Sequence, residues 1–149
     1  HRFAEAGNHI MLGGVRIEHH VGLVAHSDGD VLLHAISDGY LGALAWGDIG
    51  HWFPDTDATY KGADSSKLHA EIVNAARAEG WILNNLDATV VAERPKLQRH
   101  VPTIRQSIAD LCNASIDQVS VKATTSEKMG FVGREEGIAV HAVVSLIMP

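Results

Sequence analysis

The sequence predicts an α/β fold, built as an α+β sandwich in which helices cover one face of a mainly four-stranded sheet and a hairpin lies near the N-terminus. The first observation behind this prediction is the order of the expected elements: hairpin, helix, helix, strand, helix, strand, strand. The second is length, because 149 residues without an internal repeat or linker suit a single domain over residues 1–149. The third is a composition of 46% hydrophobic and 20% charged residues, which is typical of globular proteins.

The first two expected elements are a hairpin over residues 10–17 and a helix after Ser27. Two apolar stretches of the hairpin flank Gly13-Gly14, a pair suited to a two-residue turn. Ser27 can cap the helix, and Asp30 stands three positions later, as in a capping box. The helix is expected to run until Gly47 stops it.

The middle of the chain predicts a loop, a second helix and a strand. The loop covers residues 48–64 and is rich in turn-forming residues. A helix over 65–79 has an apolar stripe, and Gly80 follows as its stop. β-branched residues favour a strand over 86–92, which Pro95 ends.

The last third of the chain predicts one helix and two strands. A proline in the first turn favours a helix over residues 102–111, and alternation favours a strand over 119–123. A glycine-containing loop over 130–137 leads to residues 138–147, which are nearly all apolar. This last strand is therefore expected to be buried on both faces. If the second sheet face is apolar, a homo-oligomer would cover it.

Charge and composition exclude several classes of function. A net charge of -6 argues against a nucleic-acid-binding surface, because phosphate backbones attract basic patches. Cys112 is the only cysteine, so no internal disulfide is expected and a reducing compartment fits. No stretch approaches the ~20 apolar residues of a membrane span, and no secretory leader is visible.

The densest polar cluster runs from His26 to His34. Asp30, His34 and Asp38 stand at i, i+4 and i+8, so they share one face of the expected helix. His26 and the Ser27 hydroxyl lie at the helix entrance, where free amides and the helix dipole favour a phosphate. A capped helix with a solvated polar face is the alternative for the carboxylates, whereas the two histidines together favour a functional site.

Three further segments could carry chemistry, although each is weak alone. The acidic loop over residues 48–57 could bind sugar hydroxyls, and a plain turn is its alternative. Segment 122–128 holds adjacent hydroxyls, a Lys and a Glu, which suit a diphosphate and Mg²⁺, but it lacks the spacing of a phosphate-binding loop. Segment 92–97 ends a strand in a Pro-containing turn, whose backbone could recognise a nucleobase; a simple strand exit is the alternative.

Three other histidines are expected to have no catalytic role. His69 lies on an expected helix and His100 in a polar turn, so both are expected to be exposed. His141 falls in the last, apolar strand and is expected to be a core or interface histidine. None of the three has a metal-binding spacing.

Taken together and in this order, these segments resemble the 2-C-methyl-D-erythritol 2,4-cyclodiphosphate synthase family over nearly the whole chain. The runs 25–30 and 122–134 are the most specific part of the resemblance. The matching runs are Gly13-Gly14-Val15-Arg16-Ile17, Leu23-Val24-Ala25-His26-Ser27-Asp28-Gly29-Asp30, Gly47-Asp48-Ile49-Gly50, Phe53-Pro54-Asp55-Thr56-Asp57, Lys61-Gly62-Ala63-Asp64-Ser65, Pro95-Lys96, Val121-Lys122-Ala123-Thr124-Thr125-Ser126-Glu127-Lys128 and Gly130-Phe131-x-Gly133-Arg134.

The resemblance implies an enzyme of the non-mevalonate isoprenoid pathway. Its substrate would be 4-diphosphocytidyl-2-C-methyl-D-erythritol 2-phosphate, whose 2-phosphate attacks the β-phosphorus, closes a cyclic diphosphate and expels CMP. The family also implies a homotrimer with an active site at each subunit interface. The location would be the cytoplasm of a bacterium, or a plastid-like organelle in a eukaryote.

The resemblance implies two metal sites. His1 and His34 match zinc ligands, and a zinc ion with an open coordination position would polarise a phosphate oxygen. The family's zinc site also has an Asp two residues before His1, outside this sequence, and we expect the full-length chain to carry it. Glu127 would hold Mg²⁺ or Mn²⁺ at the diphosphate.

The resemblance also assigns catalytic and substrate-binding roles. His26 and Thr125 would stabilise the charge that develops in the transition state. The turn from Asp48 to Gly50 would bind ribose, residues 53–57 would surround the erythritol, and residues 92–98 would recognise cytosine. The substrate-binding residues implied in full are His1, His26, Ser27, Asp48, Ile49, Gly50, Phe53, Pro54, Asp55, Thr56, Asp57, Ala92, Glu93, Arg94, Pro95, Lys96, Leu97, Gln98, Thr124, Thr125, Ser126, Glu127, Phe131 and Arg134.

Two other functions stay open on the sequence. One is a non-catalytic module on the same trimeric scaffold that binds cytidine nucleotides or an isoprenoid diphosphate, for which the missing Asp is the only support. The other is a two-metal phosphodiesterase or nucleotide hydrolase, which would give a linear product instead of a cyclic one.

Overall fold

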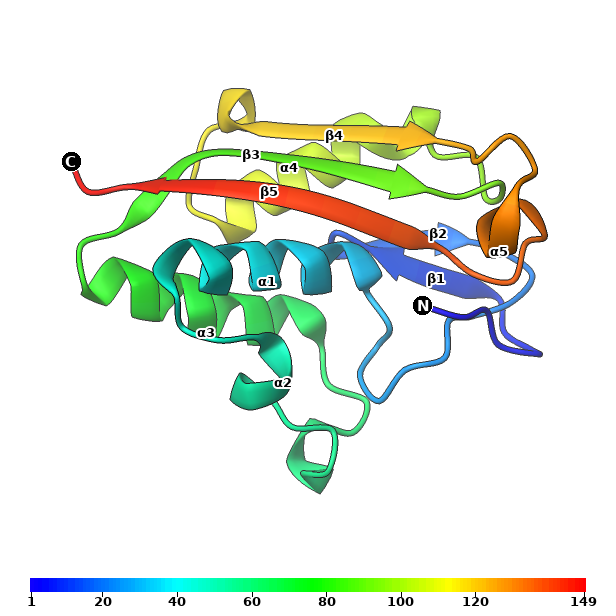
Figure 1. The fold of residues 1–149 in the computed structure, drawn as a ribbon, viewed down its shortest axis with the longest axis horizontal. Coiled ribbons are helices and arrows are strands. Elements are labelled where there is room, and N and C mark those ends of the chain that lie inside the picture. Colours follow the sequence, from blue (N-terminus) through cyan, green and yellow to red (C-terminus); the bar gives the residue numbers. More distant parts are fainter.

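The structure, a computed structural model, describes residues 1–149 and has a three-stranded sheet as its main layer (Figure 1). The strand order is β4-β3-β5. The central strand β3 (Ile82–Val91) pairs parallel with β4 (Val119–Thr124) and antiparallel with β5 (Ala139–Ile147). β3 begins four residues before the predicted strand. The prediction of a mainly four-stranded sheet is wrong by one strand, because only the three strands predicted over residues 86–92, 119–123 and 138–147 form it.

The hairpin forms its own two-stranded sheet from β1 (His9–Leu12) and β2 (Val15–Glu18). Gly13 and Gly14 form its turn with φ of 65° and 80°, left-handed values that glycine adopts without a Cβ clash, so the predicted hairpin is confirmed. The apolar side of the hairpin is buried, and the hairpin contacts α1 and α4 instead of pairing with the edge of the main sheet.

Three longer helices cover one face of the main sheet, as predicted (Figure 1). α1 (Val31–Leu44) packs on β5, α4 (Val101–Leu111) packs on β4, and α3 (Ser65–Ala78) packs against α1. Their buried apolar side chains meet those of β3 in one core. None of these helices is long and apolar enough to cross a membrane.

Two short helices lie in segments predicted as loops. α2 (Ile49–Trp52) and a 3₁₀ turn (Ala58–Tyr60) occupy the expected loop 48–64, and α5 (Gly130–Gly133) occupies the glycine-containing loop. Asp48 caps α2, and Asp57 caps the 3₁₀ turn. Because both elements are short, their sequence shows turn-forming residues and lacks the apolar period of a long helix.

The cap of α1 is Asp30, so the prediction of Ser27 as the cap is wrong. The Asp30 carboxylate accepts hydrogen bonds from the backbone N–H of Leu33 at 2.9 Å, Gly13 at 2.9 Å and Gly14 at 2.7 Å. Asp30 is fully buried. Burial raises the pKa of its carboxyl to about 6, and the three amides oppose that rise. One side chain therefore joins the hairpin turn to the start of α1.

β5 is buried on one face only in this chain. Its residues alternate, with Val140, Ala142, Val144 and Leu146 partly buried against the core. The opposite face, with Val143 at 73% exposure, is open. The prediction of a strand buried on both faces is therefore wrong for the single chain, and His141, which is exposed on the open face, is not a core residue.

His69 is buried, so its predicted exposure is wrong. It lies on α3, and its Nδ1 is 2.8 Å from Ser37 Oγ and its Nε2 3.3 Å from Cys112 Sγ. The edge of its ring meets the Tyr40 ring at a centroid distance of 5.3 Å. Burial lowers the pKa of His69 to about 4 and raises the pKa of the Cys112 thiol to about 11. Both groups are therefore neutral at pH 7.

This burial makes stability depend on pH. In the unfolded chain His69 takes up a proton near pH 6.5, whereas in the folded chain it does so only near pH 4. As pH falls through this window, the unfolded state binds the proton first and the fold loses about 3 kcal/mol of stability. Denaturant unfolding from pH 7 to pH 4 is therefore expected to show a smaller loss in a His69→Gln variant than in the native chain. If the free energy of unfolding fell equally with pH in the two proteins, this prediction would be wrong.

Candidate functional site

A pocket of about 400 Å³ opens between the start of α1 and the α2 turn. It brings together residues predicted from distant parts of the sequence. Its lining residues are His1, Ala25, His26, Ser27, His34, Ser37, Ile49, Gly50, Phe53, Pro54, Asp55, Tyr60, Ser65 and Leu68. Among these, Ala25, Ser37, Tyr60, Ser65 and Leu68 were not predicted as site residues; Ala25 and Ser65 belong to family-like runs, and the other three carry no sequence signal.

His1 and His34 face one another in this pocket. Nε2 of His1 lies 3.2 Å from Nδ1 of His34, and the rings are tilted by 58°. Backbone hydrogen bonds in both directions between His1 and Ile138, each 2.9 Å long, hold His1 in place. Zinc–nitrogen bonds of ~2.0–2.1 Å at a tetrahedral angle place two ligand nitrogens roughly 3.4 Å apart. The two nitrogens therefore fit one zinc ion.

The chain gathers no group of three His, Cys, Asp or Glu side chains in a metal-binding arrangement. The two imidazoles thus form a partial ligand set. Burial lowers the pKa of His34, which favours the neutral imidazole that a metal binds.

The other nitrogen of His34 is held by two hydroxyls. Nε2 lies 3.0 Å from Ser65 Oγ and 3.1 Å from Ser27 Oγ. Ser65 in turn donates its hydroxyl hydrogen to Asp28 Oδ1. Because the Ser65 oxygen is then an acceptor, it favours a proton on Nε2 and leaves the Nδ1 lone pair free toward His1.

Removing the Ser65 hydroxyl should therefore weaken metal binding. A Ser65→Ala variant is expected to bind zinc about tenfold more weakly, since loss of an outer-shell partner of a ligating histidine costs ~10–100-fold and Ser27 remains. Competitive chelator titration measures this. The neighbouring Ser66→Ala variant, whose hydroxyl makes no hydrogen bond to the site, is the control and should bind zinc as the native protein does. Equal zinc affinities in the two variants would show that the Ser65 hydroxyl does not support His34 as a metal ligand.

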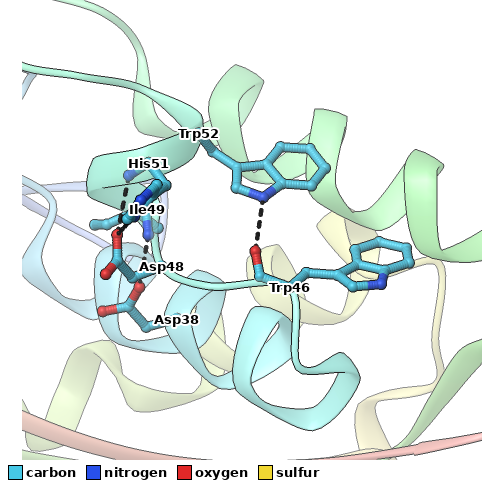
Figure 2. Close-up of polar contacts among 6 residues, drawn as sticks. All are labelled: Asp38, Trp46, Asp48, Ile49, His51 and Trp52. Carbon is cyan, nitrogen blue, oxygen red and sulfur yellow. Dashed lines mark hydrogen bonds and ion pairs between the residues drawn. The ribbon is translucent and has the colours of Figure 1, made fainter.

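The α2 turn forms one rim of the pocket. Figure 2 shows the polar contacts of this turn. Asp48 caps α2, with Oδ1 accepting the His51 N–H at 2.9 Å. This hydrogen bond lowers the pKa of Asp48, so its carboxylate is ionised at neutral pH. Of the predicted ribose residues, Ile49 and Gly50 line the pocket and Asp48 lies beside it.

Residues 53–60, which follow α2, are held beside the pocket by aromatic packing and by one contact to a backbone oxygen. Phe53 lines the pocket with its ring edge-on to Tyr60 at a centroid distance of 5.4 Å. The His26 Nε2 lies 3.3 Å from the backbone oxygen of Asp57. Asp57 and the predicted Thr56 lie beside the pocket and do not line it. The predicted erythritol segment is therefore only partly in the cavity.

A second pocket of about 360 Å³ lies where the parallel strands β3 and β4 end. Its lining residues are Ala92, Pro95, Lys96, Leu97, Gln98, Ala123, Thr124 and Thr125. Thr125 also lines an adjoining hollow of about 270 Å³ with Glu93, Arg94 and Glu127. The structure thus brings the predicted cytosine segment next to the predicted hydroxyls and the predicted second metal ligand.

Left-handed backbone shapes the loop after β4. Glu127 and Lys128 have φ of 54° and 62°, and the Glu127 N–H donates to Thr125 Oγ1 at 3.2 Å. The Lys128 N–H donates to Glu93 Oε1 at 2.6 Å. The Glu93 side chain, mostly buried, thus holds the loop, while Glu127 is exposed. Ser126 donates its hydroxyl to the Met129 carbonyl, which tightens the same turn.

The two main pockets have no residue in common. The predicted catalytic residues His26 and Thr125 therefore line different pockets of one chain. Phe131 is half exposed, and Arg134 forms an ion pair with Glu136 at 3.0 Å; neither lines either pocket. A wider polar hollow of about 920 Å³ lies along the segment from Arg94 to His100. Of its lining residues, only Arg94, Pro95, Lys96 and Gln98 were predicted as site residues.

Comparison with known proteins gives consistent matches along the chain. The family model described as the YgbB family matches residues 1–147. A 2-C-methyl-D-erythritol 2,4-cyclodiphosphate synthase of Pseudomonas fluorescens is 60% identical over 149 residues, which is 100% of this chain and 94% of the relative. The protein of the same name from Pseudomonas aeruginosa is 60% identical over 147 residues, 99% of this chain and 93% of the relative.

Solved structures agree with these matches. A 2C-methyl-D-erythritol-2,4-cyclodiphosphate synthase in a form bound to CDP has a TM-score of 0.89 and 34% identity, covering 99% of this chain and 95% of that chain. The bifunctional IspDF of Campylobacter jejuni has a TM-score of 0.93 and 42% identity, covering 98% of this chain and 39% of that one.

Proposed function

The chain belongs to the YgbB family, and from this premise we infer the reaction that it catalyses. It is a 2-C-methyl-D-erythritol 2,4-cyclodiphosphate synthase, a cyclising enzyme of the non-mevalonate isoprenoid pathway. It converts 4-diphosphocytidyl-2-C-methyl-D-erythritol 2-phosphate into 2-C-methyl-D-erythritol 2,4-cyclodiphosphate and releases CMP. The observation that carries this conclusion is 60% identity over the full 149 residues.

The reaction is an internal phosphoryl transfer. An oxygen of the 2-phosphate forms a bond to the β-phosphorus, and the bond from that phosphorus to the oxygen bridging to the α-phosphate breaks, so that CMP leaves with this oxygen. Negative charge on the transferring group must be met by positioned donors. We assign this role to His26 and Thr125, with Ser27, Thr124 and Ser126 as further hydroxyl contacts.

The family is metal-dependent, and we assign the metals by ligand chemistry. His1 and His34 would hold zinc, which the 3.2 Å approach of their nitrogens supports. Glu127 would hold Mg²⁺ or Mn²⁺, since its exposed carboxylate lies in the hollow that Thr125 lines. When bound, these ions would orient the phosphates and offset their charge.

Substrate contacts follow the two pockets. The CDP complexes of relatives support nucleotide binding. We place the ribose at the turn from Asp48 to Gly50 and the erythritol along residues 53–57. Cytosine would lie in the pocket of Ala92 to Gln98, where turn backbone offers donors and acceptors.

We propose that the active site is completed between the subunits of a homotrimer. The separate pockets of His26 and Thr125 support this, because both residues act on one phosphoryl group. The open face of β5, with exposed Val143, would be covered by neighbouring subunits. Phe131 and Arg134 would then lie near the trimer axis. Analytical ultracentrifugation should give three times the 16.0 kDa chain mass, and a monomer would exclude the proposal.

The bacterial relatives favour the cytoplasm of a bacterium as the location over a plastid-like organelle. The decisive experiment incubates full-length protein, loaded with Zn²⁺ and Mg²⁺, with the diphosphocytidyl substrate. Phosphorus NMR should show the cyclic diphosphate in a 1:1 ratio with CMP. A linear product would favour a phosphodiesterase, and binding without CMP release would favour a non-catalytic module.

A further inference from the structure

The turn that carries the ribose-binding residues is held by groups outside it (Figure 2). The Asp38 carboxylate of α1 accepts the N–H of Ile49 at 2.9 Å. The backbone carbonyl of Trp46 accepts the indole N–H of Trp52 at 3.2 Å, and the two indole rings stack at 17°. The start and the end of α2 are thus each tied to the segment that precedes the turn.

The Asp48 carboxylate lies at the start of the same turn, where it caps α2. Its Oδ1 is used by the His51 N–H, and its Oδ2 makes no hydrogen bond within the chain. The ionised Oδ2 is therefore free to accept a hydroxyl. The turn is also tight, because a Cβ on Gly50 would lie 3.3 Å from Asp48 Oδ1. A shift of Ile49, between Asp48 and Gly50, would move both ribose contacts together.

Asp38 is joined to the metal side of the site through α1. It lies four residues after His34, one helical turn or about 6 Å along the axis, on the same face. The opposite face of α1, with Ile36, Tyr40 and Leu41, is fully buried, so the helix is fixed in the core. The position of Asp38 relative to His34 is therefore rigid.

We propose that Asp38 is a positioning residue for nucleotide recognition. By holding Ile49, it sets the ribose turn at a fixed spacing from the face of α1 that carries His34. The role rests on the proposed function in one respect, namely that this turn binds the ribose of a cytidine nucleotide. Asp38 itself is exposed and does not line the pocket, so it acts through the backbone of Ile49.

An Asp38→Ala variant tests this. CDP affinity, measured by calorimetry, is expected to fall roughly tenfold, and KM for the substrate to rise by the same factor, as for loss of a charged hydrogen bond. The kcat should stay within about threefold and the zinc content should not change, because His34 is untouched. Asp38→Asn keeps an oxygen acceptor and should restore CDP affinity to within about threefold of native.

Two further variants complete the design. Glu71→Ala removes an exposed α3 carboxylate that makes no hydrogen bond, and it should leave CDP binding unchanged. Trp52→Phe keeps an aromatic ring against Trp46 but removes the indole N–H, and it should also weaken CDP binding. Native CDP affinity in Asp38→Ala would overturn the inference, as would equal losses in Asp38→Ala and Asp38→Asn. The calorimetry needs no turnover, so these results stand apart from any failure of CMP release.

Discussion

Replacing His34 by alanine is expected to remove zinc and to lower kcat/KM by about a thousandfold or more. The reason is geometric, because His34 supplies one of the two imidazole nitrogens that converge at 3.2 Å, and His1 alone is a weak ligand. Loss of a Lewis acid at a phosphate costs several kcal/mol of transition-state stabilisation, and each 1.4 kcal/mol is about tenfold in rate. Zinc content by atomic emission and CMP release give the two measurements.

The fold should survive this change. The His34 side chain is only partly buried and faces the pocket, so its loss leaves the core around Ile36 and Leu41 intact. His9→Ala, on the distant β1, is a matched control and should keep zinc and activity. A His34→Ala protein that retains a full complement of zinc would refute the assignment of this residue as a ligand.

The second large effect is expected at Glu127. A Glu127→Ala variant should need at least tenfold more Mg²⁺ for half-maximal activity and lose about a hundredfold in kcat at fixed Mg²⁺, as when one preorganised group at a developing charge is removed. Zinc should stay bound, because Glu127 lies in the hollow with Thr125 and outside the pocket of His1 and His34. Titration of activity with Mg²⁺ or Mn²⁺ measures the shift.

Glu127→Gln separates charge from shape, since it keeps the side-chain length and removes the charge. It should behave like Glu127→Ala toward Mg²⁺. Glu79→Ala removes an exposed carboxylate next to the end of α3 and should leave the titration unchanged. If zinc and Mg²⁺ binding fell together in Glu127→Ala, the two metals would not have separate ligands in this chain.

Local patterns predicted the elements best where one period or one turn type dominates. Gly13 and Gly14 indicated the hairpin because only left-handed backbone closes so short a turn, and the helices over 65–79 and 102–111 were nearly correct. The membership of the sheet could not be predicted in this way. The position of the hairpin depends on its packing against α1 and α4, which are distant in sequence. The pattern of residues 9–18 alone does not predict these contacts.

Tertiary contacts explain the remaining errors. Asp30 displaced Ser27 as the cap because its carboxylate also meets the amides of the hairpin turn. His69 is buried because it lies on the core-facing side of α3, where Ser37 Oγ and Cys112 Sγ, 32 and 43 positions away, lie within hydrogen-bond distance of its ring nitrogens. Neither contact leaves a spacing that can be read along the chain.

In the site, too, local spacing could be predicted from the sequence and long-range contacts could not. The helical spacing placed His34 and Asp38 on one face, and the structure gives them the separate roles of facing His1 and holding the α2 turn. The pairing of His1 with His34 followed only from the family resemblance, because 33 positions separate them. Ser65, whose hydroxyl lies behind His34, ends one of the runs that resemble the family, but it was not predicted as a site residue.

The buried thiol of Cys112 has a practical consequence. Only 3% of this residue is exposed, and with a pKa of about 11 it stays protonated and unreactive toward alkylating reagents at neutral pH. As the only cysteine in the chain, it leaves the surface without a competing thiol. A cysteine introduced at an exposed position away from both pockets, such as Glu71 on α3, could therefore carry a fluorophore or spin label in an otherwise native protein, and distances between such labels would test the proposed homotrimer.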